Sequence, residues 1–430
     1  MFFFDRNQYP YWMQKDIGEV VDQRHYRDPL ERARDLDDKD HLAKMREAFY
    51  FAESNVIYLD GNSLGRQPKE TQELLSVIVN QQWGNSLISA WEHWVELPFS
   101  AGDLLAEHVL GASRGRVLVT DSTTVNLFKL AGALLANRGR RRTVLIEGDS
   151  FPTDRYVIEG LAQQHGVDLV VVQSDPVLGV SLEALEKAFS DDVIFACFSM
   201  VSYLSAAKLD IESANRIAKA KNSTIIWDLS HAAGAQVIDL EASGSEFGVG
   251  CSYKYLNAGP GAPAYLYVHR EFDLELLSPI RGWFSQANQF DMAPRYDPRP
   301  DIGRFMSGTP NIIGTALVAQ GAKLVGAAGV GALQAKSAML GDFFIEVADT
   351  YLAQYGFEVA SPRDSSARGA HVSLAHVRAK EITRVLASDV GVIVDFRMPN
   401  LIRFGFAPLY VSFYDVADAV SRIVKVAKSF

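Results

Sequence analysis

A lysine and an aspartate in the middle of the chain have the types and the setting that cofactor chemistry requires. Asp228 ends the apolar segment TIIWD, and Lys254 follows the apolar run Phe247–Ser252 within the segment CSYKYLNAGPG. The glycines near this lysine permit a close approach of the backbone to a ligand. A lysine amine can hold pyridoxal phosphate (PLP) as a Schiff base, and an acidic group can keep the ring nitrogen of PLP protonated. The pair therefore indicates PLP-dependent chemistry on an amino acid.

Each of these two residues also has an ordinary structural interpretation. An aspartate after a strand is most often a helix cap, and an isolated lysine is most often exposed to solvent. The combination is more specific, because this lysine is framed by aromatic residues and glycine after an apolar segment. The residues alone leave both interpretations open, and the pair favours the cofactor.

A phosphate site is expected in the segment TDSTTVNLF, residues 120–128. The segment combines a strand end, a hydroxyl-rich turn and a helix start, and free N–H groups at a helix N-terminus bind anions. Ser and Thr are also the commonest helix caps, so the segment alone is a weak indication. The later segment DSFPTD offers Phe151 to stack on a flat ring and Thr153 to cap a helix.

Short apolar segments that alternate with helical patterns would position these residues. We expect strands at 56–59, 116–120, 143–147, 167–172, 193–199, 224–228 and 265–268, and helices at 68–83, 124–136, 153–165, 182–189 and 211–221. Continuously apolar strands between helices indicate a mostly parallel sheet that is covered on both faces. Right-handed crossovers place the C-terminal ends of such strands at one edge, where ligands bind.

The remaining segments predict an N-terminal arm and a smaller C-terminal domain. Residues 1–55 are highly charged, and Pro29–Phe49 is expected to form an exposed amphipathic helix. The large domain is expected over 56–310 and ends in an ordered, functional loop region. Residues 311–430 are expected to form a connecting helix and a small α+β domain, with helices at 312–326, 331–354, 381–389 and 415–429 and strands near 358, 371–376 and 402–406.

Composition narrows the class of protein. The 430 residues favour two packed domains, and the net charge of -10 argues against a general nucleic-acid binder. The local run of arginines at 138–142 is interpreted as a solvated loop. Cys197 and Cys251 lie in apolar segments outside any metal-binding pattern, so we expect buried, reduced thiols in a cytoplasmic protein and no metal site.

Neither a targeting segment nor a membrane helix is expected. The run Phe2–Phe4 is followed at once by charged residues and is too short for the core of a signal peptide. No segment approaches the ~20 uninterrupted apolar residues that a membrane helix needs.

Seven segments together resemble the kynureninase family, from about residue 56 to the C-terminus. They are YLDGNSLGRQP (58–68), TTVNL (123–127), SFPTDRY (150–156), WDLSHAAG (227–234), CSYKYLNAGPG (251–261), RGWF (281–284) and IRFGFAPLYVSFYDV (402–416). The resemblance implies a PLP-dependent enzyme of fold type I, with a mostly parallel seven-stranded sheet and usually a homodimer that shares its active site. Members of the family hydrolyse the Cβ–Cγ bond of kynurenine or 3-hydroxykynurenine and release alanine and an anthranilate.

The resemblance also implies roles for the matching residues. Lys254 would form the Schiff base, Asp228 would pair with the ring nitrogen, and Tyr253 would reach the phosphate and serve in proton transfer. The other cofactor residues would be Thr123, Thr124, Phe151, Thr153, Ser199 and His231, with Trp283 and Thr309 from the neighbouring subunit. Arg403 would hold the substrate α-carboxylate through its planar fork. Trp91, Asn62 and Phe284 would face the substrate.

Two segments depart from the family pattern and leave alternatives open. Ser285-Gln286 replaces a Gly-His pair, and Ser205-Ala206 replaces a Thr-Gly pair; both are expected near the substrate side chain. Hydrolysis of kynurenine is the best single interpretation. The alternative is a kynureninase-like enzyme of antibiotic biosynthesis that performs β-elimination, or decarboxylation-coupled oxidation, on a cysteine S-conjugate.

Other PLP classes fit the residues less well. A class-V aminotransferase is a further alternative, which pyridoxamine formation with an amino donor would reveal. A desulfurase needs a nucleophilic cysteine on a loop, and Cys251 lies inside an apolar run. A protein that binds PLP without catalysis is disfavoured because Lys254, Asp228 and Arg403 are all present.

Overall fold

A seven-stranded sheet forms the centre of the large domain in this computed structural model, which describes residues 28–51, 55–272 and 276–430. The strand order is β2-β8-β7-β6-β5-β3-β4. Only β8 runs antiparallel to its neighbours, so the mostly parallel sheet expected from the sequence is confirmed. The strands are β2 (Val117–Val119), β3 (Thr143–Glu147), β4 (Asp168–Val172), β5 (Val193–Ser199), β6 (Thr224–Asp228), β7 (Phe247–Gly250) and β8 (Tyr265–Val268).

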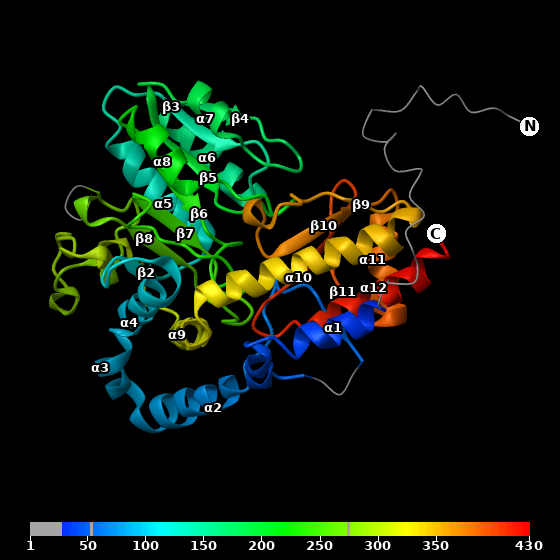
Figure 1. Cartoon of the computed structure of the whole chain (residues 1–430). Helices are drawn as coiled ribbons and strands as arrows, with labels where there is room; N and C mark the ends of the chain where they lie inside the picture. The colour runs from blue at the N-terminus through cyan, green and yellow to red at the C-terminus, as the bar shows by residue number, and fades with distance from the viewer. Residues whose placement is uncertain (1–27, 52–54, 273–275) are drawn as a thin grey trace, which may run out of the picture.

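Alternate side chains of these strands enter two separate hydrophobic clusters, one on each face of the sheet. In β3, Val144 and Ile146 belong to one cluster and Leu145 to the other. This alternation follows from the two-residue period of a strand, and burial on both faces explains why the strands are continuously apolar. The helices that follow β2 to β5 pack around the sheet (Figure 1) and are α5 (Thr123–Ala136), α6 (Pro152–His165), α7 (Leu182–Ala188) and α8 (Ile211–Lys219). Cys197 and Cys251 are buried and free, as expected.

A four-stranded antiparallel sheet lies beside the large domain and forms the small domain (Figure 1). Two long helices lead to it, and Phe344 on the second packs on Phe404 and Phe406 with ring centroids 4.6 and 5.2 Å away. The strands are β9 (Glu358–Val359), β10 (His371–Ala375), β12 (Asp395–Arg397) and β13 (Leu401–Gly405). The helices are α9 (Ile312–Ala328), α10 (Val330–Tyr351), α11 (Ala379–Val390) and α12 (Phe413–Ala427), with short turns η12 (Ala353–Tyr355) and η13 (Ser365–Ala367).

The first described elements pack on the small domain. Helix α1 (Pro29–Asp37) lies along α12, and the Asp37 carboxylate accepts hydrogen bonds from the first backbone N–H groups of α12 at 2.8 and 2.9 Å. Strand β1 (Ile57–Tyr58) pairs in parallel with β11 (Val392–Ile393). The strand expected to open the large domain therefore lies against the C-terminal part of the chain. The run Phe2–Phe4 and the start of the expected arm lie outside the described residues.

The sequence predicted two long helices near the N-terminus, and both are shorter in the structure. The helix expected over Pro29–Phe49 ends at Asp37, and a separate turn, η4 (Ala43–Ala48), follows it. Between them Asp40 forms a buried ion pair with Lys336 of α10 at 2.7 Å, a tertiary contact that the local pattern does not reveal. The helix expected to reach Trp83 is α-helical only in α2 (Glu70–Ser76) and then widens into a π-helix, η5 (Val77–Ser86).

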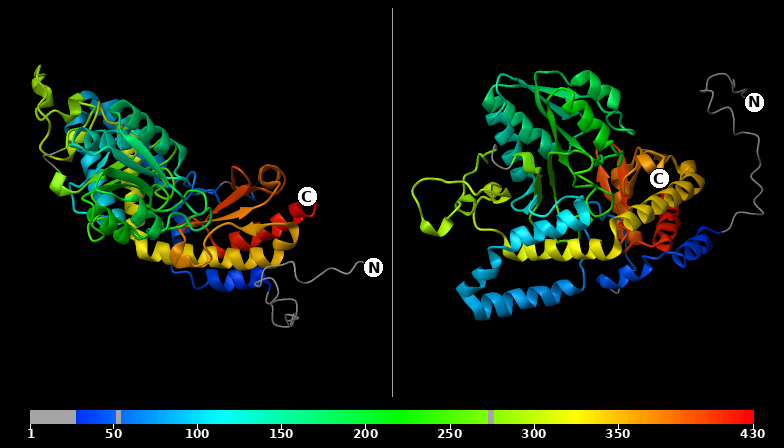
Figure 2. Two further views of the ribbon diagram at one scale, coloured as in Figure 1. Left: turned by 90° about the horizontal axis from the view of Figure 1, so that it is seen from above. Right: turned by 60° about the vertical axis from the view of Figure 1, so that its left-hand side comes forward.

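Between η5 and β2 the chain returns to the body through a series of short helices, which are η6 (Leu87–Ala90), α3 (Trp91–Trp94), α4 (Leu97–Leu105) and η7 (Ala106–Leu110). The loop region after β8 projects from the large domain on the side away from the small domain (Figure 2). It contains the short turns η8 (Arg270–Phe272), η9 (Trp283–Ser285), η10 (Gln289–Asp291) and η11 (Ile302–Phe305).

Among the described residues, no single helix is long and apolar enough to cross a membrane; α9 and α10 reach that length and composition only together, as a pair bent by 79°.

Candidate active site

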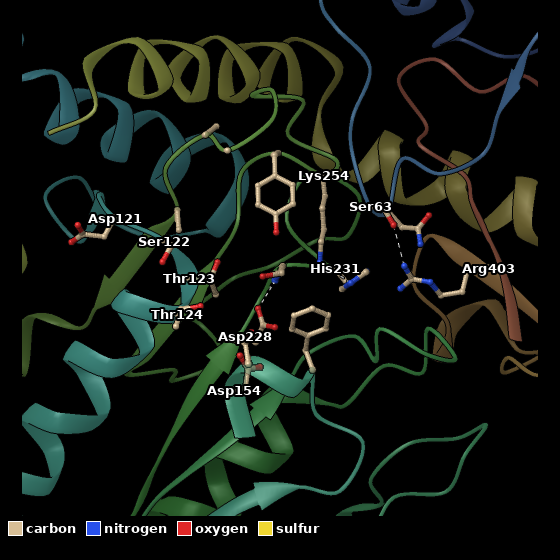
Figure 3. Close-up of a pocket in the computed structure, with 18 of the residues that line it drawn as sticks. Ser63, Asp121, Ser122, Thr123, Thr124, Asp154, Asp228, His231, Lys254 and Arg403 are labelled. Atoms are coloured by element: carbon tan, nitrogen blue, oxygen red, sulfur yellow. Dashed lines mark hydrogen bonds between the residues drawn. The ribbon is translucent and has the colours of Figure 1, made fainter. Parts of the chain in front are cut away.

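A cavity of about 320 Å³ opens at the edge of the sheet where the parallel strands end, and residues of the small domain close its other side. Figure 3 shows its long direction, with Asp121–Thr124 at one end, Lys254 and His231 in the middle and Arg403 at the far end. Of the residues expected to act, the structure brings Asn62, Thr123, Thr124, Phe151, Thr153, Asp228, His231, Tyr253, Lys254 and Arg403 to this one cavity.

The first end of the cavity is built to bind an anion. Ser122 is the N-cap of α5, and its hydroxyl accepts a hydrogen bond from the N–H of Val125, so Thr123 and Thr124 are the first two helical residues. Their backbone N–H groups lack partners within the helix, and the positive end of the helix dipole adds to their attraction for a phosphate. The neighbouring Asp121 is neutralised by the fully buried Lys129 at 2.7 Å, which removes a negative charge that would otherwise oppose an anion here.

Lys254 occupies the middle of the cavity on the turn that follows β7. Its Nζ lies 2.8 Å from Nε2 of His231 and 5.9 Å from the centre of the Phe151 ring. Burial and the Lys254 charge hold the pKa of His231 well below its ordinary value. The neutral imidazole therefore accepts a hydrogen bond from Lys254 at Nε2, which leaves its proton on Nδ1. Nδ1 is buried without a partner, as expected of a group that faces an added ligand.

Three carboxyl groups converge below Lys254. Asp228, the last residue of β6, keeps one oxygen bonded to the N–H of Ser230 at 2.8 Å. Burial raises the pKa of Asp154 well above its ordinary value, and the charges of Asp228 and Glu147 add to this effect. Burial likewise raises the pKa of Glu147 to about 7. Asp154 therefore favours its protonated form, and it lies at the cavity wall together with Asp228.

Of three further residues expected to contact the cofactor, Tyr253 lies where it was expected, whereas Ser199 and Thr153 differ from the prediction. Tyr253 lines the cavity, and the adjacent Cys251 sulfur together with burial raises the pKa of its phenol, which therefore keeps its proton. Ser199 ends β5 beside Asp228, but its backbone is bonded to Glu147 at 3.1 Å and it does not line the cavity. Thr153 does not cap α6, because the helix begins at Pro152 and Phe151 takes the cap position.

The far end of the cavity is more crowded than the sequence indicates. Arg403 on β13 is 1% exposed and donates to Asp395, to Ser63 and to the carbonyl of Tyr203. Arg397 lines the same wall and forms a second ion pair with Asp395 at 2.7 Å. Asn62 is fully buried here, and neither its amide nitrogen nor its amide oxygen has a partner.

Besides Ser199, four residues expected at the site do not line the cavity within this chain. Trp91 and Phe284 pack on each other with ring centroids 6.0 Å apart, and Trp283 packs on Phe284 at 4.5 Å. Thr309 is exposed at the end of the same loop region. The three aromatic residues form a cluster outside the cavity, in which Trp91 of α3 packs on the loop region that projects from the large domain.

Neither departure from the family pattern lines the cavity of its own chain, and their expected position near the substrate side chain stays a prediction. Ser285 is buried and shares a hydrogen bond with the Tyr296 hydroxyl, while the Gln286 side chain accepts from the N–H of Asp297 at 2.7 Å. These bonds hold the projecting loop together. Ala206 keeps the left-handed backbone, with φ 65°, that a glycine adopts at no cost.

Several neighbours of the cavity were not expected from the sequence. Asp154 stood within the segment SFPTDRY, whose spacing places it one helical turn after Phe151. Asp395 and Arg397 come from β12, a strand too short to be recognised by its pattern. His371 on β10 is buried 5.6 Å from the His231 ring with both nitrogens unpaired, and burial lowers its pKa to about 3.

The donor set fits PLP. A helix N-terminus suits a phosphate, a partly buried lysine suits an aldehyde, and a carboxylate below the lysine suits a protonated ring nitrogen. The unpaired Nδ1 of His231 and the Phe151 ring flank the space between these groups. The three groups therefore face one cavity in the order in which they occur along this cofactor (Figure 3).

Gly65 of the segment YLDGNSLG supports the lysine turn from behind. Its N–H donates to the carbonyl of Tyr253 at 2.7 Å, and a Cβ added to it would overlap the Lys254 carbonyl oxygen and Asn257. Replacing Gly65 with alanine is expected to lower the free energy of unfolding by about 1–3 kcal/mol and to weaken cofactor retention, because backbone atoms must move apart. Urea unfolding and the rate of cofactor loss measure the two effects.

The matched control is Gly160→Ala in α6, where an added Cβ meets no atom within 4 Å. This variant is expected to be neutral, or more stable by up to about 1 kcal/mol, because alanine favours the helix. Equal stability and cofactor retention for the two variants would contradict the close approach at Gly65.

Known proteins resemble this chain over most of its length. A family model described as the kynureninase C-terminal domain matches residues 333–423. The kynureninases of Pseudomonas fluorescens and Deinococcus radiodurans are each 38% identical to the chain, over 90% and 91% of its length and 92% and 94% of theirs. The kynureninase of Burkholderia pseudomallei is 36% identical over 91% of this chain and 94% of its own.

Solved structures share the fold at lower identity. A cysteine desulfurase from Thermococcus onnurineus NA1 matches with a TM-score of 0.79 at 19% identity, over 90% of this chain and 98% of its own. The cysteine desulfurase CsdA from Escherichia coli matches with a TM-score of 0.77 at 17% identity and the same coverage. These likenesses show the architecture alone, which is fold type I of the PLP-dependent enzymes.

Proposed function

The chain belongs to the kynureninase family, and from this premise we propose that it hydrolyses the Cβ–Cγ bond of L-kynurenine or a ring-substituted kynurenine to an anthranilate and alanine. One observation carries the proposal. A single cavity places Lys254 between the N-terminus of α5 and the guanidinium of Arg403, with Asp228 below. That order gives an α-amino acid a place for its amine next to the lysine and for its carboxylate next to the arginine.

The cofactor of this enzyme is PLP. Thr123 and Thr124 would hold its phosphate, Phe151 and His231 would enclose its ring, and Lys254 would bind its aldehyde carbon. When bound, PLP supplies a sink for the electrons left on the substrate Cα after a proton is removed. Asp228 would maintain that sink by keeping the ring nitrogen protonated, and burial raises the pKa of the neighbouring Asp154, which therefore favours its neutral form.

Lys254 moves the proton at Cα in the proposed reaction. Substrate binding frees its amine, which then lies near both the substrate and Nε2 of His231, 2.8 Å away in the structure. The neutral His231 can hold the amine in position without competing for the proton, because burial disfavours a second proton on the imidazole. Tyr253, which keeps its phenol proton, is a further donor at the cavity wall.

A second copy of the chain is part of the proposal. Trp283 is 42% exposed and Phe290 67% exposed on the projecting loop region. Trp283, Phe284, Trp91 and Thr309 do not line the cavity of their own chain. In a homodimer, this loop region would reach the partner's cavity and cover the substrate side chain there. We place the enzyme in the cytoplasm, in keeping with two buried, free cysteines.

Among the described residues, a desulfurase reaction lacks a matching feature, whereas β-elimination does not. A desulfurase mechanism needs a mobile nucleophilic cysteine, and Cys251 and Cys197 are both buried, which raises the pKa of each thiol. β-Elimination from a cysteine S-conjugate would need only Lys254 and Asp228, so it is tested directly against kynurenine hydrolysis.

The test is product analysis with the PLP-loaded enzyme. Incubation with L-kynurenine and with 3-hydroxykynurenine is expected to release the fluorescent anthranilate and alanine in equal amounts. Matched incubations with S-substituted cysteines are expected to give no pyruvate. No anthranilate from either kynurenine, with pyruvate and thiol from an S-substituted cysteine, would contradict the proposed function; pyridoxamine formation would indicate an aminotransferase.

A further inference from the structure

At the far end of the cavity, the guanidinium groups of Arg403 and Arg397 both pair with the carboxylate of Asp395. Asp395 accepts from Nε of Arg403 at 2.7 Å, from Nη2 of Arg403 and from the hydroxyl of Ser63 at 2.8 Å, and it forms an ion pair with Nη2 of Arg397 at 2.7 Å. Asp395 therefore lies between the two arginines and fixes both of them. The family resemblance assigns the substrate carboxylate to Arg403 alone.

Arg403 has little capacity left for a ligand. Four hydrogen bonds to Asp395, Ser63 and the Tyr203 carbonyl engage its side chain, which is 1% exposed. A guanidinium has five N–H groups, so a single one is left for the substrate. That is too few for the two parallel hydrogen bonds with which an arginine usually binds a carboxylate.

Arg397 has the capacity that Arg403 lacks. Its side chain is 34% exposed, it lines the cavity, and its Nε is buried without a hydrogen-bond partner. Its other contacts are the ion pair with Asp395 and a bond from Nη1 to the Phe396 carbonyl at 3.2 Å. A partly exposed guanidinium at the wall of a cavity, with fewer contacts than its five N–H groups, has donors that a ligand can complete.

We propose that Arg397 and Arg403 bind the substrate α-carboxylate together, with Asp395 as the positioning residue that holds the two guanidinium groups side by side. The inference deepens the proposed function and rests on it in one respect, that the ligand is an α-amino acid. It assigns direct substrate contact to Arg397 and a preorganising role to Asp395.

The side-chain charges at this end of the cavity favour the binding of one carboxylate. Arg397 and Arg403 contribute two positive charges against one from Asp395, so one positive charge is left. Asp60 is the other acidic group nearby, and burial together with the charge of Asp395 raises its pKa to about 6. A bound carboxylate would favour the protonated form of Asp60 further, so the substrate and Asp60 need not both be charged.

The experiment compares ligands with and without a carboxylate on the PLP-loaded enzyme. The visible absorbance of the lysine-bound cofactor reports binding, and the probes are L-alanine and L-phenylalanine with their decarboxylated counterparts, ethylamine and phenethylamine. In Arg397→Gln, the dissociation constants of the amino acids are expected to rise about 10- to 100-fold, while those of the amines stay unchanged. Arg397→Lys keeps the charge but loses the planar guanidinium. Its affinity for the amino acids is expected to fall less than that of Arg397→Gln.

Arg363→Gln is the matched control, because Arg363 is 60% exposed and pairs with Asp349 on the surface. It is expected to bind both kinds of probe as the unchanged enzyme does. Asp395→Asn keeps the size of the side chain but removes the charge that holds both arginines. This variant is expected to bind the amino acids more weakly and to bind the amines as the unchanged enzyme does. An equal loss for amino acids and amines in Arg397→Gln and Arg397→Lys, or no loss for either, would overturn the proposal.

The outcome is distinct from that of the proposed function. Any L-amino acid that shifts the absorbance can serve as a probe. The binding comparison therefore tests the role of Arg397 even when the enzyme does not cleave kynurenine. If the enzyme binds no amino acid more tightly than the matching amine, the assignment of a carboxylate site to Arg397 fails, whatever reaction the enzyme performs.

Discussion

Replacing Lys254 with alanine is expected to remove the visible absorbance of the lysine-bound cofactor and to lower the rate of kynurenine cleavage about 10⁴-fold or more. The variant loses both the covalent attachment and the group that moves the Cα proton. The side chain lines the cavity 2.8 Å from His231, and its loss leaves the surrounding backbone contacts unchanged. Absorbance spectra and anthranilate fluorescence measure the two losses.

Two controls separate this effect from a general loss of positive charge. Lys187→Ala removes a lysine that is 75% exposed and paired with Glu183, and it is expected to leave both absorbance and rate unchanged. Lys254→Arg keeps the charge but cannot form the imine, so it is expected to be as inactive as Lys254→Ala. Substantial activity in either Lys254 variant would exclude this residue as the cofactor lysine.

Replacing Asp228 with asparagine is expected to lower the cleavage rate by about 10²–10⁴-fold, the range usual for a single acid–base group. The amide has no charge to keep the ring nitrogen protonated, so the electrons left on Cα lose their sink. Asparagine can still accept the Ser230 hydrogen bond of 2.8 Å, so the fold and the binding of PLP are expected to survive. Steady-state rates with kynurenine, after the cofactor content has been checked, measure the loss.

Asp154→Asn is the matched control for this prediction. Asp154 is already protonated, because burial and the charges of Asp228 and Glu147 raise its pKa, so an amide there changes the charge of the site little. The cleavage rate of Asp154→Asn is expected to fall less than that of Asp228→Asn. If Asp154→Asn lost more activity, the negative charge would have to be assigned to Asp154 instead.

The large sheet could be predicted closely because its strands are short, continuously apolar and separated by helical patterns. Strands β5 and β6 have the same bounds in the structure as in the sequence prediction. The small domain was predicted less completely, since β1, β11 and β12 have only two or three residues each and gain their pairing from distant segments. Local patterns do not contain that information.

The half of the site that binds the cofactor was predictable because each of its residues follows a strand of the same sheet. Asp228, Thr123 and Lys254 all lie near strand ends at one edge, which parallel topology brings together. The carboxylate end was only partly predictable. The segment IRFGFAPLY indicated Arg403, whereas its pairing with Asp395 and the exposure of Arg397 depend on the antiparallel register of β12 and β13.

The two departures from the family pattern show a further limit of motifs. The resemblance placed Ser285-Gln286 and Ser205-Ala206 near the substrate side chain, because they replace residues of the family pattern. In the structure Gln286 instead fastens the projecting loop at Asp297, and Ser205 and Ala206 form a buried turn. That turn leads from Tyr203, whose carbonyl accepts from Arg403 at 2.6 Å, so it acts on the cavity through the backbone.

The most direct test of the central claim is to locate the cofactor on the chain. Borohydride reduction of the PLP-loaded enzyme fixes the cofactor to its lysine, and mass spectrometry of the peptides then identifies that residue. The expected result is one modified lysine per chain, Lys254, in the peptide that contains SYKYLNAGPG. Attachment at another lysine, such as the buried Lys129, or no attachment at all, would contradict the site described above.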